Sequence, residues 1–316
     1  MVYLDNAATT KPIGELTNNW FNSNSSYSNG NEIIWECKKT IAECIKVKPT
    51  EIFFTSGGCE GNRICIDTLY SYLNRPVLIS KFEHKSVYTN NKAIPSNNPE
   101  YCMFINNETG YKFDISNCLG SDMVQALGKE YIDCSNLLCA TFSGHKIHSY
   151  KGIGFIYISE SIQKYMPDIS RTMDLDKIIH ITGRVKNVTE NLTQHRDKII
   201  QLRKLLFSEL DKMGIDYKVN CDRIDSSIIS LVINELGEYV CNRLQEKEIY
   251  ISTGSACNTG KGSYVLENMG LSKYERDRVI RVSLDSENSM GDIREFVREL
   301  RGERVGEENL LNNTYT

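Results

Sequence analysis

The sequence lacks the features that mark membrane-spanning, secreted and nucleic-acid-binding proteins. No apolar run comes near the roughly 20 residues that cross a bilayer. The first six residues show no basic stretch followed by an apolar core, so we expect no secretory signal peptide. With 37 basic and 41 acidic residues the formal net charge is −4, which argues against a basic surface for nucleic acid. We therefore expect no membrane contact, no direct nucleic-acid binding and a cytoplasmic location.

The 11 cysteines also lack any regular spacing. None belongs to a C-x-x-C pair or to a zinc-ligand pattern, so no metal site is predicted. A disulfide scaffold in a chain of 316 residues would be unusual, so most cysteines are expected to be reduced, buried side chains. The sequence contains no repeat and no low-complexity segment. Its length favours one large domain with a smaller partner.

Short β-branched or aromatic runs alternate with helical patterns, which indicates a parallel α/β sheet. A long helical pattern from 189 to 213, followed by Gly214, is expected to lead into a second domain. We expect a large domain over 13–190 with helices on both faces of its sheet, and a small α+β domain made of 1–12 and 191–316. The other predicted elements are strands at 52–55, 77–80, 101–105, 138–142, 154–158, 227–233 and 249–252, and helices at 31–46 and 238–247.

A glycine-rich motif, Gly57-Gly58-Cys59-Glu60-Gly61-Asn62, follows the predicted strand 52–55 and opens a helix. Glycines let backbone amides approach a ligand, and a helix N-terminus favours an anion such as a phosphate. A tight turn between a strand and a helix needs glycines as well. Taken alone, the motif therefore fits a plain turn at least as well as a phosphate site.

Lys146 stands in Ser143-Gly144-His145-Lys146, directly after the predicted strand 138–142. Ligands of open α/β sheets lie at the carboxyl ends of the strands, so these side chains are expected to face the ligand crevice. A lysine there can form a Schiff base, and Ser143 and His145 are suited to holding a phosphate. For a single lysine, an ordinary surface position is the commoner explanation.

Three further polar residues suit the same chemistry. Asp122, expected at a strand end, can keep a pyridine nitrogen protonated, although such residues are more often turn or cap residues. His84 can stack on a planar group and move protons, or can be a plain loop histidine. Arg281, within a strand-like run, can clamp a carboxylate or form a surface ion pair.

Cys257 lies in a run of small, polar and glycine residues, Ser252-Thr253-Gly254-Ser255-Ala256-Cys257-Asn258-Thr259-Gly260. Such a run has little capacity to form a core and is expected to be a mobile, exposed loop. A cysteine placed there is a candidate nucleophile rather than a packing residue.

Together these motifs make the sequence resemble the cysteine desulfurases, which are fold-type I transferases similar to class-V aminotransferases and dependent on pyridoxal 5'-phosphate (PLP). The resemblance covers most of the chain in collinear order. The motifs that carry it are Tyr3-Leu4-Asp5-Asn6-Ala7-Ala8-Thr9-Thr10, Asn24-Ser25-Ser26, Phe54-Thr55-Ser56-Gly57, Glu60-Gly61-Asn62, Glu83-His84-Lys85, Asn106-Asn107-Glu108-Thr109-Gly110, Asp122 with Gln125, Ser143-Gly144-His145-Lys146, Lys151-Gly152-Ile153-Gly154, Ser252-Thr253-Gly254-Ser255-Ala256-Cys257 and Ile280-Arg281-Val282-Ser283-Leu284.

The resemblance implies a role for each matching residue. Lys146 would bind PLP and shuttle the α-proton, and His84 would stack on the ring as an acid–base group. Arg281 would grip the substrate carboxylate, and Cys257 would take sulfur from L-cysteine as a persulfide, releasing alanine. The remaining cofactor contacts would come from Asp122 to the pyridinium nitrogen, Gln125 to the phenolic oxygen, Asn107 to cofactor or substrate, and Ser143, His145, Gly58 and Cys59 to the phosphate. A homodimer and a sulfur-acceptor protein, serving iron–sulfur cluster assembly or tRNA thiolation, are implied as partners.

The chain departs from the family pattern at several positions. Gly58-Cys59 replaces a usual Ala-Thr pair and removes a hydroxyl from the phosphate site, and Tyr27 stands where a histidine is common. The loop after Cys257 is slightly short. Between Ile158 and the long helix, the family carries a longer segment with an Arg-Ser-Gly-Thr motif, of which only residues 182–188 form a degenerate remnant.

Two alternatives to an active cysteine desulfurase follow from these departures and from the chemistry. One is a selenocysteine or cysteine lyase that needs no protein persulfide. The other is a low-activity homologue that acts as a partner in a sulfur pathway.

Overall fold

The computed structural model describes residues 1–16, 29–169, 172–254 and 262–302. Cys257 and Tyr27 lie outside these residues. The largest sheet in the described part has seven strands in the order β2-β8-β7-β6-β5-β3-β4. Strand β8 runs antiparallel to both of its neighbours, and the other neighbouring pairs are parallel. The strands are β2 (Ile52–Thr55), β3 (Val77–Ser80), β4 (Ala93–Ser96), β5 (Tyr101–Met103), β6 (Gly120–Asp122), β7 (Cys139–Ser143) and β8 (Gly154–Ile158).

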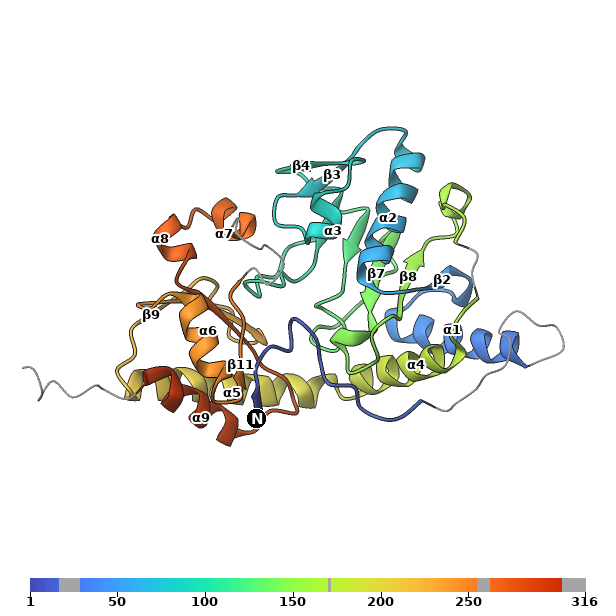
Figure 1. Ribbon diagram of the computed structural model, residues 1–316. Helices are drawn as coiled ribbons and strands as arrows, with labels where there is room; N and C mark the ends of the chain where they lie inside the picture. The colour runs from blue at the N-terminus through green and yellow to red at the C-terminus, as the bar shows by residue number, and fades with distance from the viewer. Residues whose placement is uncertain (17–28, 170–171, 255–261, 303–316) are drawn as a thin grey trace, which may run out of the picture.

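Helices cover both faces of this sheet (Figure 1). Successive side chains of a strand point to opposite faces, and a strand buried on both faces is apolar throughout. In β8, Phe155 and Tyr157 belong to the hydrophobic cluster that contains α1 (Gly30–Ile45) and α4 (Leu175–Glu190). Ile156 and Ile158 belong to a second cluster with α2 (Gly58–Leu73). The predicted α/β fold, a mainly parallel sheet with helices on both faces, is confirmed.

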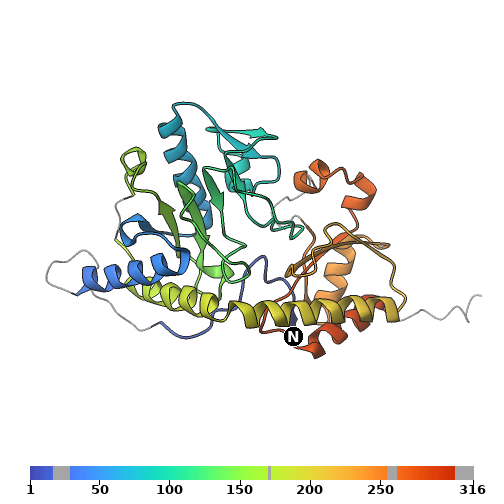
Figure 2. The same ribbon diagram turned by 180° about the vertical axis from the view of Figure 1, so that it is seen from behind.

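A second group of elements follows α4. Helix α5 (Leu192–Lys212) continues from α4 beneath both parts of the molecule, and Figure 2 shows the two helices almost end to end. A third hydrophobic cluster joins α5 to Val2, Leu4 and the C-terminal elements. These elements are β1 (Val2–Tyr3), β9 (Tyr217–Val219), β10 (Ile228–Ile233), α6 (Gly237–Gln245), β11 (Ile249–Tyr250), α7 (Tyr264–Asn268), α8 (Lys273–Arg276), β12 (Val279–Ser283) and α9 (Met290–Arg301). The division at residues 12 and 190 stays a prediction.

The sheets of this second group bring the N-terminus to the C-terminal half of the chain. Strands β9, β10 and β12 form an antiparallel sheet with β10 in the middle, and β1 pairs in parallel with β11. The isolated bridge between Asp5 and Ser283 extends this contact. As a result, residues 5–10 run between the two parts of the molecule, as the dark blue trace in Figure 1 shows.

Several described elements were missed by the sequence reasoning, and β4 and α4 are the most informative of them. Strand β4 contains Pro95, and it pairs only with β3 because it lies at the edge of the sheet, where a proline is tolerated. Helix α4 covers the region that the sequence described only as a remnant, and the break before α5 falls at Asn191. The short helix α3 (Lys85–Tyr88) and the 3₁₀ turns at Pro49–Glu51, Gly144–Lys146 and Gln163–Tyr165 complete the described elements. No helix in the described ranges has both the length and the apolarity needed to cross a bilayer.

Candidate active site

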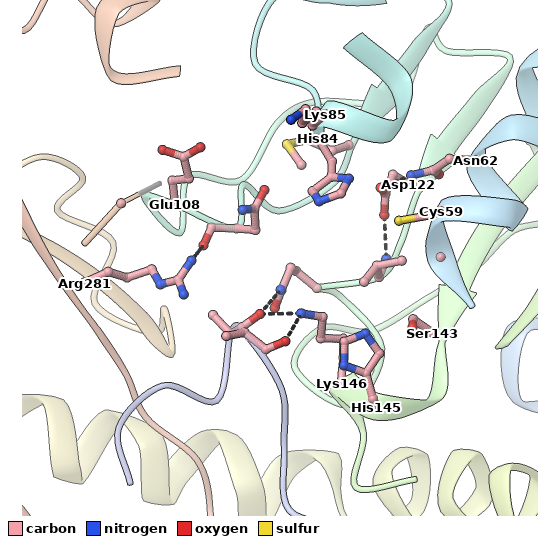
Figure 3. A pocket seen from close by; sticks show the side chains of 18 of the residues that line it. Cys59, Asn62, His84, Lys85, Glu108, Asp122, Ser143, His145, Lys146 and Arg281 are labelled. Carbon is pink, nitrogen blue, oxygen red and sulfur yellow. Dashed lines mark hydrogen bonds between the residues drawn. The ribbon is translucent and has the colours of Figure 1, made fainter. Parts of the chain in front are cut away.

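A cavity of about 330 Å³ lies where strands β5, β6 and β7 end (Figure 3). The last residues of β6 and β7, Asp122 and Ser143, both line it. Every predicted site residue in the described part of the chain lines this cavity; they are Gly58, Cys59, His84, Asn107, Asp122, Gln125, Ser143, His145, Lys146 and Arg281. The structure therefore brings them together, and Cys257 alone of the predicted site lies outside the described residues.

Lys146 ends the 3₁₀ turn that follows β7, and its amine points toward the N-terminal segment. Its Nζ donates to the carbonyl oxygens of Ala7 at 2.6 Å and Ala8 at 2.5 Å. Burial, together with the positive charges of Lys129 and Arg281, lowers the pKa of Lys146 from 10.5 to about 7. An amine with this pKa is largely neutral in slightly alkaline solution, as a nucleophilic lysine requires.

Asp122 is held rigidly on the opposite side of the cavity. Its Oδ2 accepts a hydrogen bond from Asn62 Nδ2 at 2.7 Å, and its Oδ1 accepts from the Val124 amide at 2.9 Å. Asn62 is fixed in turn by the hydroxyl of Tyr101, which donates to Asn62 Oδ1 at 2.8 Å. Because both carboxylate oxygens are engaged by N–H donors, the side chain presents a fixed negative charge to the cavity.

His84 stands above the cavity with a defined proton position. The Ser86 amide donates to Nδ1 of His84 at 3.2 Å, so the proton of the neutral ring lies on Nε2. Burial lowers the pKa of His84, the charge of Asp122 opposes this shift and the charge of Lys146 adds to it. The lowered pKa favours the neutral ring, whose Nε2–H can donate a hydrogen bond into the cavity.

The start of α2 forms a cradle for an anion. The hydroxyl of Ser143 is buried and has no hydrogen-bond partner within the described residues. A Cβ on Gly58 would lie 2.9 Å from Val124 Cγ2, and one on Gly57 would lie 3.7 Å from Ser143 Oγ, so the absence of side chains keeps this space open. Gly58 and Cys59, which open α2, line the same end of the cavity, where a helix N-terminus favours an anion. A buried hydroxyl without a partner in the described residues, a helix N-terminus and open space fit a phosphate.

His145 borders this cradle as a neutral ring. Burial and the charges of Lys146 and Lys151 lower its pKa to about 4. Its Nδ1 lies 3.2 Å from the hydroxyl of Thr9. A neutral histidine can offer one N–H to an oxyanion without adding a charge.

Arg281 lies on β12, on the far side of the cavity from Asp122, with only 3% of its surface exposed (Figure 3). It donates to the carbonyl oxygen of Asn107 at 2.9 Å and to Asp5 Oδ1 at 2.7 Å. Its Nε has no partner in the described ranges. A guanidinium has more N–H donors than these two contacts use, so Arg281 can still bind a carboxylate.

Gln125 is oriented by its neighbours. Its Nε2 donates to the Ala7 carbonyl at 2.8 Å, and its Oε1 accepts from Lys129 at 2.8 Å. Burial lowers the pKa of Lys129 to about 8. Lys129 was not predicted as a site residue, although its spacing of four residues from Gln125 is the spacing of neighbours on a helical turn.

Glu108 was also missed, although it lies within a quoted motif. It lines the cavity with only 8% of its surface exposed, and burial raises its pKa to about 7 despite the hydroxyl of Ser263 and the charge of Arg281. No sequence signal marked it, because its burial depends on residues more than 150 positions away.

The model of the class-V aminotransferase family matches residues 2–98 and 102–179, which is more than half of the chain. The chain belongs to the class-V aminotransferase family. Curated relatives of this class-V aminotransferase include a cysteine desulfurase of Bradyrhizobium diazoefficiens, 25% identical over 370 positions, covering 94% of this chain and 92% of the relative. A cysteine desulfurase IscS of Buchnera aphidicola is 26% identical over 371 positions, with coverages of 94% and 91%. The predicted resemblance to the cysteine desulfurases is confirmed.

Solved structures share the fold. A NifS-like protein superposes with a TM-score of 0.83 at 22% identity, covering 95% of this chain and 98% of its own. The NifS-like protein of Rickettsia africae superposes with a TM-score of 0.80 at 24% identity, with coverages of 95% and 99%. These likenesses support the fold-type I assignment of the class-V aminotransferase.

The alignments also bear on the shortening after Ile158. They extend over 370 positions or more although the chain has 316 residues, so the relatives carry residues with no counterpart here. In the structure, Thr182 lies inside α4 and donates to the Ile178 carbonyl at 2.7 Å, and Arg184 donates to the Ile147 carbonyl at 3.3 Å. Neither residue lines the cavity.

Proposed function

We propose that this class-V aminotransferase is a PLP-dependent cysteine desulfurase. It takes sulfur from L-cysteine, releases L-alanine and carries the sulfur as a persulfide on Cys257 before passing it to an acceptor protein. The observation that carries the proposal is the single cavity that holds a lysine with a lowered pKa, a fixed carboxylate, an unpartnered buried hydroxyl and a buried arginine. The cysteine desulfurases among its curated relatives support it.

The residues present fit PLP as the cofactor. Ser143, His145 and the backbone at Gly58 and Cys59 would hold its phosphate. Asp122 would pair with the ring nitrogen, Gln125 with the phenolic oxygen, and Lys146 with the aldehyde carbon. PLP, when bound, supplies an electron sink that allows bonds at the α-carbon of an amino acid to break.

The polypeptide supplies binding and proton transfer. Arg281 binds the carboxylate of L-cysteine, with the carbonyl of Asn107 and the carboxylate of Asp5 fixing the guanidinium. The amine of Lys146, with a pKa of about 7, can take the α-proton and return a proton in the same pH range. His84 can hold a proton on Nε2 while Nδ1 stays bound to the Ser86 amide.

Cys257 is proposed as the sulfur acceptor within the enzyme. The described residues near either side of its segment, Gly254 and Tyr264, both line the cavity. In the transfer, a sulfur–sulfur bond forms between the Cys257 thiolate and the substrate sulfur while the carbon–sulfur bond of the substrate breaks. The carbon then receives a proton, so L-cysteine and the thiol become L-alanine and the persulfide.

An absorbance spectrum of the purified protein tests the proposal. We expect a yellow protein whose long-wavelength band changes when L-cysteine is added, together with release of alanine. Cys257→Ala should keep the band but lose the persulfide. A colourless protein that PLP cannot reconstitute contradicts the proposal and favours a non-catalytic partner of a sulfur pathway. A Cys257→Ala variant that still releases sulfide, or selenide from selenocysteine, favours a lyase without a protein persulfide.

The homodimer, the identity of the acceptor protein and the cytoplasmic location stay predictions. The size of the PLP-loaded protein in solution tests the homodimer.

A further inference from the structure

Glu108 stands out among the cavity residues because none of the proposed steps uses it. It is the acidic residue on the Arg281 side of the cavity, opposite Asp122 (Figure 3). Its loop is fixed by Asn106, whose Oδ1 accepts hydrogen bonds from the amides of Glu108 at 2.9 Å and Thr109 at 3.0 Å. Its carboxylate therefore occupies a set position.

One side of this carboxylate contacts the start of α7. The hydroxyl of Ser263 donates to Glu108 Oε2 at 2.5 Å. The same hydroxyl oxygen accepts from the Leu266 amide at 3.1 Å, as the N-cap of α7. Because the oxygen is engaged by the amide, its proton is directed to Glu108, and the carboxylate fixes the residue at which α7 begins.

The other side of the carboxylate lies against Gly254. A Cβ built on Gly254 would lie 3.4 Å from the same Oε2 atom and 3.1 Å from Leu266 Cδ1. Just before it, Ser252 and Arg281 exchange two backbone hydrogen bonds, at 3.2 and 2.6 Å. The same carboxylate oxygen thus accepts a hydrogen bond from Ser263 and lies close to Gly254, the described residues on either side of 255–261.

We propose that Glu108 is a positioning residue: its hydrogen bond from Ser263 fixes the start of α7, and its packing beside Gly254 restrains the described residue on the other side of the Cys257 segment. The catalytic role of Glu108 rests on the proposed function, because fixing this segment matters only where the Cys257 thiol must reach a substrate. The structural role of Glu108 can be tested without that function.

Trypsin cleavage after Lys261 measures this anchoring without any turnover. In the PLP-loaded protein, Glu108→Ala and Ser263→Ala should each speed cleavage at Lys261 by roughly three- to tenfold, the equivalent of one ordinary hydrogen bond. Glu108→Gln should retain most of the protection, because its amide oxygen still accepts from Ser263. The double variant Glu108→Ala with Ser263→Ala should be no faster than the faster single variant, because both changes remove the same contact.

Asn268→Ala is the matched control. Asn268 Nδ2 donates to the Lys81 carbonyl at 3.0 Å, so it also ties α7 to the neighbouring part of the molecule without touching Gly254 or Ser263. Cleavage at Lys261 that is unchanged in Glu108→Ala and Ser263→Ala overturns the proposal. So does an equal acceleration in Asn268→Ala, because general docking of α7 would then explain the protection.

Steady-state kinetics give the second readout. The KM for L-cysteine and the cofactor absorbance of Glu108→Ala should match those of the unchanged protein, while kcat for alanine release falls by about tenfold or more. A raised KM with unchanged kcat would instead place Glu108 in substrate binding and overturn a positioning role. If the unchanged protein releases no alanine, the proposed function fails, and cleavage at Lys261 still decides whether Glu108 anchors the segment.

Discussion

At the scale of single residues, the site depends on how burial tunes two amines. Lys146 has its pKa lowered to about 7 chiefly by burial and then by the charge of Lys129. Lys129 is itself a buried amine with a pKa lowered to about 8, and it contacts Gln125. The charge of Lys129 therefore makes it harder for Lys146 to carry a proton.

This coupling predicts the pH dependence of cofactor uptake. Because the neutral amine of Lys146 is the form that attacks an aldehyde, the rate of PLP uptake by the apoprotein should rise with pH up to about 7 and level off above it. In Lys129→Gln the midpoint should move to higher pH, because removing a neighbouring positive charge stabilises protonated Lys146. Absorbance at the cofactor band follows the uptake. A midpoint that stays in place or moves down contradicts this account.

A second prediction at this scale concerns Cys59, which lies in the first turn of α2 and lines the phosphate cradle. Cys59→Thr should tighten PLP binding by about tenfold, because a hydroxyl there adds a hydrogen bond to a charged group. Cys59→Val has nearly the shape of Thr without the hydroxyl and is the matched control. Titration of the apoprotein with PLP measures both. Equal affinities for the Thr and Val variants would show that the hydroxyl does not reach the phosphate.

The sequence predicted some of the residues that line the cavity and missed others. Lys146, Asp122 and Arg281 follow or lie in predicted strands with unusual residue types at strand ends, and the structure places all three in the cavity. Glu108 and Lys129 carry no such signal, because a glutamate or a lysine in a loop is ordinary until the fold buries it. Burial is a property of the folded chain, and the sequence pattern near a residue does not contain it.

At the scale of elements, two helices each contain a glycine, one in a tightly packed interface and the other in open space. A Cβ on Gly61 of α2 would lie 2.7 Å from Thr141 Cγ2 of β7, so α2 packs against the sheet through a residue without a side chain. A Cβ on Gly183 of α4 would meet no described atom within 4 Å. The close approach of α2 to β7 keeps its N-terminus next to Ser143.

These two glycines give a matched pair of substitutions. Gly61→Ala should lower the free energy of unfolding by about 1–3 kcal/mol, because the methyl group overpacks the interface with β7. Gly183→Ala should raise it by about 0.5–1 kcal/mol, because alanine favours the helix and nothing opposes the methyl group. Urea denaturation measures both. Similar values for the two variants would mean that α2 can move away from the sheet at little cost.

The bounds of several buried strands could be predicted from the sequence, but their direction and the edge strand could not. The apolar runs at 52–55, 77–80 and 154–158 were predicted with the bounds observed, because buried strands are continuous apolar segments. The direction of β8 was not predictable from its sequence, because a strand buried on both faces has the same composition in either direction. Strand β4 was missed since Pro95 and its exposed edge position weaken the strand pattern.

At the scale of the whole molecule, an ionic network centred on a buried carboxylate joins the two groups of elements. Glu130, with 3% of its side chain exposed, contacts Lys112 at 2.8 Å, Arg196 of α5 at 3.0 Å and also Arg223. Asp225 completes the network through contacts of 2.6 Å to both arginines. The carboxylate of Glu130 therefore offsets cations from both sides of the molecule.

Glu130→Gln should lower the free energy of unfolding by about 1–3 kcal/mol, because it removes the buried negative charge that two partly buried arginines and an exposed lysine share. Glu36→Gln is the control, since Glu36 pairs with Lys39 at 2.7 Å with both side chains well exposed, and such pairs contribute about 0–1 kcal/mol. Thermal and urea denaturation provide the comparison. A loss for Glu130→Gln as small as that for Glu36→Gln would mean that the two parts are joined by apolar packing alone.

The path of the N-terminal residues has a consequence for how the protein is made. The carbonyls that hold Lys146 belong to Ala7 and Ala8, and this stretch is itself held by Asp5 to Arg281 and by Asn6 to Ser283 at 3.0 Å. During synthesis, the opening residues leave the ribosome long before the strand that secures them. A chain that ends before β12 can bury much of its large sheet. It lacks Arg281 and Ser283, however, which hold the segment that positions Lys146. We therefore expect the lysine site to form only after β12 has been synthesised and folded.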